Sequence, residues 1–175
     1  LQGSGASDRT QAGQGMSRAA FFPIVIAAVL ASVTAMVGGT ITILDEWYYS
    51  LQQPAWAPPG YMFGIIWTGI FALIAIAGVL GWRAAPTRRD AEIMLGLFAL
   101  NGFLNLLWSF LFFRLHRPDL AFYELIALWL SIAALILFCG RFSKGAAVLL
   151  VPYLVWVTIA GLLNYQVVQL NGPFG

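Results

Sequence analysis

Charged residues are scarce in this sequence. Aspartate, glutamate, lysine and arginine make up 9% of the 175 residues, whereas 61% are hydrophobic. A soluble domain of this length needs far more polar surface to cover its core. The scarcity of charge therefore excludes a water-soluble globular domain and indicates an integral membrane protein. The net charge of +2 is also too small and too scattered to indicate nucleic-acid binding.

Cysteine is almost absent as well. Cys139 is the single one, so the chain forms no internal disulfide, and no histidine lies near it at the spacing of metal ligands. The sequence contains no nucleophile elbow, phosphate-binding loop or metal motif. We therefore expect no metal and no required cofactor, and any chemistry has to come from aromatic side chains or from a ligand.

Long apolar runs take the place of charge. Five of them are about 20 residues long, which is enough for a helix to cross a bilayer. None alternates in the way that the strand of a membrane barrel requires. The sequence predicts an all-α integral membrane protein, a bundle of five transmembrane helices with a long structured loop between the first two. The expected helices span residues 19–41, 60–82, 91–113, 118–139 and 145–170.

Residues 1–15 are polar, small and aperiodic, which predicts a disordered segment or a remnant of cloning. Residues 16–175 then form a single five-helix membrane domain. The positive-inside rule places the N-terminus in the cytoplasm, and the long loop and the C-terminus on the opposite side. The basic residues on the N-terminal side are Arg9, Arg18, Arg83, Arg88, Arg89, Arg141 and Lys144, against Arg114 and Arg117 on the other.

Small residues recur at every fourth position of the first predicted helix, at Ala27, Ala31, Ala35 and Gly39. Such a stripe lets the backbone of another helix approach closely. It fits packing within the bundle, and it also fits the contact surface of a homodimer. The sequence has no internal repeat, which disfavours transporters built from inverted repeats.

Aromatic and polar side chains share single faces of three later helices, because they follow one another at helical spacing. An amide in hydrocarbon needs a partner on another helix, a water molecule or a ligand. Core packing and interhelical hydrogen bonds explain such faces, and so does a ligand pocket. The three sets are Phe63, Trp67 and Phe71; Asn101, Asn105, Trp108 and Phe112; and Tyr153, Trp156, Ala160 and Asn164.

The depth of these residues in the bilayer favours the pocket. With a helical rise of about 1.5 Å per residue, Trp67, Asn105, Glu124 and Asn164 lie about 9–12 Å below the end that carries the long loop. Trp156 lies deeper, near the midplane. We therefore expect a cavity under the loop with aromatic walls, a few polar groups and Trp156 as its floor.

Prolines shape the long loop. Proline fixes its own backbone angle and keeps the preceding residue extended, so residues 51–57 cannot continue the second helix. Pro59 suits the start of that helix, where its missing N–H is no loss. We predict that this loop is a stiff lid over the cavity, anchored by Trp56, with Trp67 pointing into the cavity below.

Isolated ionisable residues give weaker signals. Glu124 either belongs to a functional site, as acids within membrane spans often do, or reaches the lipid headgroups. His116 has no second histidine or acid at a catalytic spacing, so we expect it to be solvated. Asp45 and Glu46 fit a solvated, a salt-bridged or a functional position.

Several segments recur in one known family. The loop reads W-Y-x-x-L-x-x-P-x-W-x-P-P from Trp47 to Pro59 and is followed by Trp67, and the third predicted helix contains LNGFLNLLWSFLFF. The fourth helix carries Glu124, and the last contains PYLVWVTIAGLLN. In this order, over residues 20–171, they resemble the TspO/MBR family of bacterial tryptophan-rich sensory proteins and mitochondrial translocator proteins, the peripheral-type benzodiazepine receptors.

The resemblance implies a membrane receptor or carrier, usually a homodimer, in the bacterial cell membrane. It implies binding of porphyrins such as protoporphyrin IX, haem-type tetrapyrroles and other hydrophobic ligands beneath the lid, and regulation of tetrapyrrole or stress responses. The implied candidates for ligand binding, including those from the residue patterns, are Trp47, Tyr48, Trp56, Pro58, Phe63, Trp67, Asn105, Trp108, Ser109, Glu124, Tyr153, Trp156, Ala160 and Asn164.

The resemblance also implies an alternative function, a light- and oxygen-dependent enzyme that degrades porphyrin, with Trp67 and Trp156 as catalytic residues. Sterol binding through the recognition pattern of the last helix is disfavoured, because no basic residue follows Tyr165. The near absence of charge within the spans argues against a proton-coupled transporter. A purely structural role in a membrane complex stays open.

Overall fold

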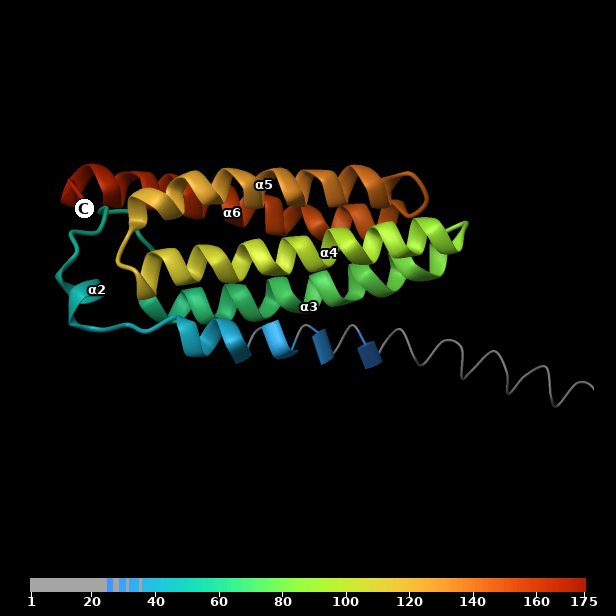
Figure 1. The fold of residues 1–175 in the computed structure, drawn as a ribbon, viewed down its shortest axis with the longest axis horizontal. Coiled ribbons are helices and arrows are strands. Elements are labelled where there is room, and N and C mark those ends of the chain that lie inside the picture. Colours follow the sequence, from blue (N-terminus) through green and yellow to red (C-terminus); the bar gives the residue numbers. More distant parts are fainter. Residues whose placement is uncertain (1–24, 27–28, 31, 35) are drawn as a thin grey trace, which may run out of the picture.

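The computed structural model describes residues 25–26, 29–30, 32–34 and 36–175. This part of the chain is all-helical and contains no strand. Four long helices lie side by side along the bundle (Figure 1), and each is long and apolar enough to cross a membrane. They are α3 (Gly60–Ala84), α4 (Arg88–Ser109), α5 (Pro118–Gly140) and α6 (Lys144–Asn171). The predicted all-α membrane fold is confirmed, with helix ends within a few residues of those expected.

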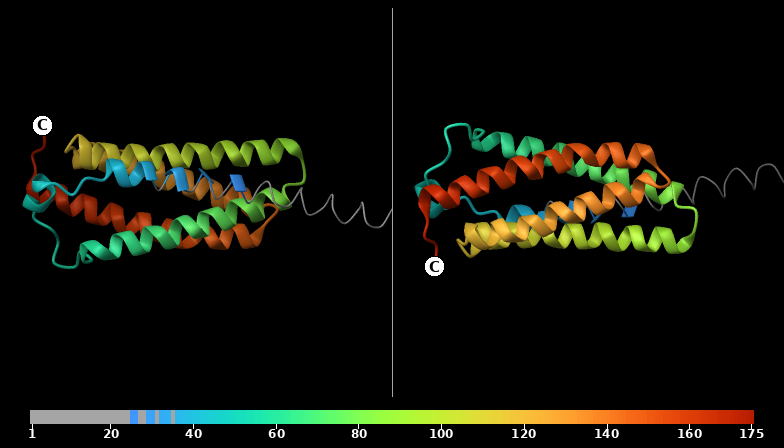
Figure 2. Two further views of the ribbon diagram at one scale, coloured as in Figure 1. Left: turned by 90° about the horizontal axis from the view of Figure 1, so that it is seen from below. Right: turned by 90° about the horizontal axis from the view of Figure 1, so that it is seen from above.

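The first predicted helix falls only partly within the described residues, all of which are helical up to residue 41. It rests on α4 (Figure 2), since a Cβ at Gly38 would lie 3.8 Å from Leu106 Cδ2 and a Cβ at Gly102 would lie 3.9 Å from Thr34 Oγ1. Residues 1–15 and three members of the small-residue stripe, Ala27, Ala31 and Ala35, lie outside the described residues. The count of five spans therefore stays a prediction.

Local chemistry sets where the helices begin. Pro59 precedes the first turn of α3 with φ −56°, as expected from its position in the sequence. The hydroxyl of Thr87 accepts from the backbone N–H of Asp90 at the start of α4, and Ser143 Oγ does the same for Ala146 at the start of α6. Short turns follow α3 and α5, so consecutive helices are antiparallel neighbours.

The last turn of the third predicted helix is a π-helix rather than an α-helix. This element, η1 (Phe110–Arg114), continues directly from α4. A π-turn holds more residues than an α-turn, so it widens the helix end. Phe112 and Phe113 both contact the Trp108 ring here, with centroids 5.5 and 6.0 Å away. The π-turn thus brings two phenylalanines to the lid end of the bundle.

The core is tightest at the end of the bundle away from the long loop. Its buried residues are Ala77, Met94, Leu135, Cys139, Ala146 and Leu150, from all four long helices. A Cβ at Gly81 would lie 2.6 Å from Met94 Sδ, so only glycine fits there without a shift of that side chain. A second cluster, in the middle of the bundle, contains Tyr153 and Trp156.

Residues 42–59 connect the first helix to α3 and cross the other end of the bundle; we call them the lid. They contain the short helix α2 (Glu46–Ser50), whose N-cap Asp45 accepts from the backbone N–H of Tyr48 at 3.0 Å. Figures 1 and 2 show the lid at the same end as the C-terminus. The lid therefore closes the end of the bundle opposite the tight core.

Candidate functional site

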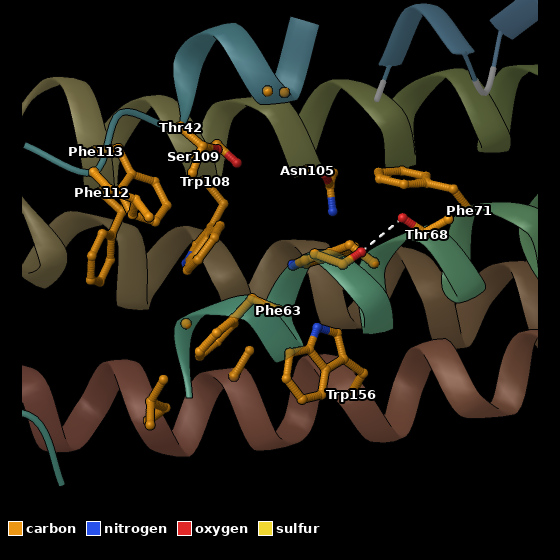
Figure 3. A pocket seen from close by; sticks show the side chains of 18 of the residues that line it. Thr42, Phe63, Thr68, Phe71, Asn105, Trp108, Ser109, Phe112, Phe113 and Trp156 are labelled. Atoms are coloured by element: carbon orange, nitrogen blue, oxygen red, sulfur yellow. Dashed lines mark hydrogen bonds between the residues drawn. The ribbon is translucent and has the colours of Figure 1, made fainter. Parts of the chain in front are cut away.

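A cavity of about 710 Å³ lies under the lid, between the first helix, α3, α4 and α6 (Figure 3). This volume is typical of small-molecule sites. Its wall is mainly apolar, as the sequence predicts. The lining residues are Ser32, Gly38, Gly39, Thr42, Leu44, Tyr48, Gln53, Gly60, Tyr61, Phe63, Gly64, Trp67, Thr68, Phe71, Ala72, Ala75, Asn105, Trp108, Ser109, Phe112, Phe113, Trp156, Ala160, Leu163, Asn164 and Val167.

Aromatic rings from different helices support one another around the cavity. The ring of Trp67 stacks on Phe71 of the same helix, with centroids 5.5 Å apart. Phe63 meets Trp156 of α6 edge to face at 5.7 Å. Aromatic pairs in these geometries are attractive and restrict each other's rotamers. The cavity thus has stiff aromatic walls that offer π-faces to a flat ligand.

A buried hydrogen-bond network ties α4, α5 and α6 together behind these walls. The Tyr153 hydroxyl donates to Asn101 Oδ1 at 3.2 Å and accepts from Asn105 Nδ2 at 3.3 Å. Asn101 Nδ2 in turn donates to Ser131 Oγ at 2.8 Å. These bonds satisfy polar groups that would be costly in hydrocarbon. For the amides of α4 the sequence allowed either interhelical hydrogen bonds or a ligand pocket. Asn105 fits both, because it bonds to Tyr153 of α6 and also lines the cavity.

Asn164 makes a second link between helices. Trp108 Nε1 donates to Asn164 Oδ1 at 3.1 Å, and Asn164 Nδ2 donates to the carbonyl oxygen of Pro118 at 2.8 Å. One side chain of α6 thus holds a cavity tryptophan and the first turn of α5. We infer that Trp108 is fixed in its rotamer.

Trp156 differs from Trp108 in its hydrogen bonding. Its side chain is 7% exposed, and Nε1 is buried with no hydrogen-bond partner in the described part of the chain. Figure 3 shows this nitrogen pointing into the cavity. A buried donor without an acceptor costs roughly 1–3 kcal/mol. A ligand with an acceptor atom in this position would remove that cost.

The lid is fastened on one side by His116, in the turn between η1 and α5. His116 Nε2 lies 3.0 Å from Asp45 Oδ2, and its ring stacks on Trp47 at 4.1 Å. The hydrogen bond from the backbone N–H of Tyr48 is the main cause that holds the pKa of Asp45 below its ordinary value, and His116 contributes less. The side chain of His116 is 38% exposed, and the fold also brings it a partner from 71 residues away that the sequence did not indicate. Its φ of 54° is unusual for a residue other than glycine.

The lid is fastened on the other side by α6. Asn171 Oδ1 accepts from the backbone N–H of Gln52 at 2.7 Å, and Asn171 Nδ2 donates to the carbonyl oxygen of Gln52 at 3.0 Å. Trp56 Nε1 donates to Gln166 Oε1 at 2.7 Å. This bond agrees with the predicted anchor role of Trp56.

The structure brings together most of the predicted ligand-binding residues. Those that line the cavity are Tyr48, Phe63, Trp67, Asn105, Trp108, Ser109, Trp156, Ala160 and Asn164. Trp47, Trp56 and Pro58 belong to the lid outside the lining, and Tyr153 packs behind Trp67 with ring centroids 6.2 Å apart. These four residues therefore lie outside the cavity lining.

Glu124 does not line the cavity either. Both of its carboxyl oxygens are buried, and neither has a hydrogen-bond partner among the described residues. It precedes Ser131 by seven residues on α5, so it shares the face that bonds to Asn101 of α4. This burial disfavours the interpretation that Glu124 reaches the headgroups.

Several lining residues were not among the predicted ones. Thr42 and Gln53 come from the lid, where no periodicity exists to place them. Phe113 lies in the π-turn and lines the cavity, and α-helical spacing does not predict this position. The two adjacent phenylalanines of the family segment were the one sequence signal that pointed to it. Thr68 follows Trp67 and also lines the cavity, and its hydroxyl donates to the carbonyl oxygen of Gly64 at 2.8 Å.

Fold and site together define a helical membrane protein with an aromatic-walled cavity under a fastened lid. The model of the TspO/MBR family matches residues 23–170, and the chain belongs to this family. It is similar to the tryptophan-rich protein TspO of Chlorobaculum tepidum, with 39% identity over 131 residues, 72% of this chain and 80% of that protein.

Two further relatives span a wide range of organisms. Protein CrtK of Rhodobacter capsulatus is 33% identical over 156 residues, 89% of this chain and 95% of that protein. The translocator protein of Ovis aries is 35% identical over 127 residues, 72% of this chain and 75% of that protein. The predicted family resemblance is confirmed.

Proposed function

We propose that this protein is a membrane receptor or carrier that binds porphyrins and other flat hydrophobic ligands in the cavity under the lid. The observation that carries the proposal is the cavity itself, walled by Trp67, Trp108 and Trp156. Large π-faces suit a macrocycle that stacks on them. Trp156 lines the floor and has a buried Nε1–H without an acceptor in the described part of the chain.

The proposal includes two roles for bound porphyrin, regulation of a tetrapyrrole or stress response and movement of the ligand. The name of the Ovis aries relative, translocator protein, supports the carrier role. Membership of a family that includes bacterial proteins supports a location in a bacterial cell membrane.

Titration of the protein in lipid nanodiscs with protoporphyrin IX in the dark tests this proposal. We expect saturable binding with about one porphyrin per cavity. Ala160→Phe, which fills the cavity, should abolish it, whereas Ala127→Phe on the exposed face of α5 should not. Equal binding by both variants would place the ligand outside the cavity and contradict the proposal.

The same cavity favours a second candidate function, the degradation of protoporphyrin by light and dioxygen. Trp67 and Trp156 both line the cavity, so photogenerated oxidants formed at a bound porphyrin would reach them. Illumination with protoporphyrin should bleach its spectrum faster with the wild type than with W67F/W156F. Equal bleaching would show that ordinary photochemistry suffices.

A homodimer is a further part of the proposal. The stripe of Ala27, Ala31, Ala35 and Gly39 supports it, because small residues at every fourth position let the backbone of a second helix approach closely. Ala31→Leu should convert a dimer to a monomer in native mass spectrometry. A monomeric wild type would contradict this part.

The proposed orientation has the lid outside the cytoplasm. Arg83, Arg88, Arg89, Arg141 and Lys144 lie in or beside the turns opposite the lid, which agrees with the positive-inside rule. Labelling of single cysteines in intact cells, in a Cys139→Ala background, tests this. An impermeant reagent should label a cysteine in the lid and not one in the α3–α4 turn.

A further inference from the structure

The cavity is unequally enclosed by the helices around it. Its α4 and α6 walls contain buried residues such as Asn105 and Trp156. Its α3 wall is different, because every fourth residue along one face both lines the cavity and is exposed. These residues are Gly60, Gly64, Thr68 and Ala72. The cavity is therefore open along the α3 side and closed on the other two.

The described residues of the first helix lie against α4, where Gly38 approaches Leu106. A Cβ built at Gly39, by contrast, would meet no atom within 4 Å, and the same is true at Gly64 of α3. We call the space between residues 38–42 and residues 60–72 the side opening. Gly39 and Gly64, one on each edge, place no side chain in this space.

The side opening is apolar and faces away from the lid fastenings. The hydroxyl of Thr68 is bonded to its own helix and offers no free donor toward the opening. On α3 the neighbouring Ile65 is 68% exposed, as expected for a side chain in contact with lipid. A ligand in the bilayer would reach the cavity here without unfastening the lid from Asn171 or His116.

The unpartnered Trp156 Nε1 is an independent sign of a ligand at the inner end of this path. It is more than nine-tenths buried and points into the cavity (Figure 3). Buried indole N–H groups usually have an acceptor. The side opening thus leads from the lipid to a donor that lacks one.

We propose that flat hydrophobic ligands enter the cavity laterally from the bilayer, through the side opening, while the lid stays fastened. This inference rests on the proposed function. It assigns the opening to apolar ligands dissolved in lipid, because its edges carry no charge to recognise a water-borne ion.

Stopped-flow association of protoporphyrin IX with nanodisc-embedded protein, followed by porphyrin emission, tests the route. Gly64→Leu places a side chain in the opening without striking any atom within 4 Å at Cβ. We expect association to slow by at least about tenfold. Gly69→Leu, also unhindered, exposed and outside the cavity, should bind at the wild-type rate.

Two further variants keep the test decisive. Gly39→Leu narrows the opening from its other edge and should reproduce the effect if Gly64→Leu fails to fold. Asn171→Ala loosens the lid and should leave the association rate unchanged. Lateral entry would be overturned if Asn171→Ala associated faster than the wild type, or if Gly64→Leu and Gly39→Leu both associated at the wild-type rate. In either case saturable binding, and with it the proposed function, would persist. Absence of saturable binding by the wild type would instead overturn the proposed function.

Discussion

The two ends of the bundle are built from the same four long helices but are packed in opposite ways. Away from the lid, Leu135, Cys139, Ala146 and Leu150 are fully buried, and a Cβ at Gly81 would fit only if the Met94 side chain shifted. At the lid end, the helices diverge around a cavity of about 710 Å³. Bilayer-embedded helices associate through close packing, which a cavity forfeits. Stability therefore belongs mainly to one end and binding to the other.

Polar links compensate for the lost packing at the lid end. Asn164 and Tyr153 join three helices by hydrogen bonds, and the lid is bonded to α6 and to the turn after η1. The tight end has no comparable network among its core residues. This contrast predicts that variants at the two ends separate stability from affinity.

The largest expected effect is at the tight end. Leu135→Ala should lower the free energy of unfolding by about 2–4 kcal/mol, because it leaves a cavity in a fully packed core. Chemical denaturation in detergent measures it. Leu137→Ala on the same helix, where the side chain is 74% exposed, is the control and should have little effect. Porphyrin affinity at a temperature where both fold should stay at the wild-type value; a large loss would break the division between the ends.

The network behind the cavity should give an intermediate effect. Tyr153→Phe removes the hydroxyl that bonds to Asn101 and Asn105, so we expect a loss of about 1–2 kcal/mol in unfolding free energy. Tyr123→Phe, at a 70% exposed side chain on α5, is the matched control. If both substitutions had equal effects, the network would contribute nothing to the stability of the lid end.

The lid should respond locally to the loss of its α6 bonds. Asn171→Ala removes the acceptor for the Gln52 N–H and the donor to the Gln52 carbonyl. Hydrogen exchange of residues 50–54 should then speed up severalfold with little change in unfolding temperature, because local opening costs less than global unfolding. The exposed Gln169 makes a suitable control through Gln169→Ala. Unchanged exchange would show that other contacts hold the lid.

The smallest expected effect is the pH dependence of the lid. The backbone N–H of Tyr48, and to a smaller extent the ring of His116, stabilise the charged form of Asp45 and hold its pKa below the ordinary value of 3.8. Because the pKa is lowered in the folded state, this contribution is present above pH 3.8 and is lost as the pH falls through the lowered pKa. Exchange of lid amides, corrected for intrinsic rates, should therefore be slower at about pH 6 than at about pH 3.

Asp45→Asn isolates this pH effect. Asparagine keeps a side-chain acceptor for the Tyr48 N–H but does not titrate. The corrected exchange rates of the variant should be equal at the two pH values. A persistent difference would assign the pH dependence to another group.

The helices and most of the cavity wall could be predicted from the sequence, because helical spacing fixes which residues share a face. Trp67, Asn105 and Asn164, expected at one depth, do line one cavity. Residues could not be placed from the sequence where the backbone departs from an α-helix or where distant segments meet. The π-turn adds Phe113 to the wall, and only the fold shows that His116 meets Asp45.

The central claim is that the tryptophans of the cavity bind porphyrin. The most direct test is the dissociation constant of protoporphyrin IX, measured from porphyrin absorption so that loss of tryptophan emission does not interfere. W67F/W156F removes two cavity indoles, whereas W82F/W129F removes two that lie outside the cavity. The account predicts at least about tenfold weaker binding for the first pair, about 1.4 kcal/mol, and no change for the second. Wild-type affinity in both double variants would contradict it.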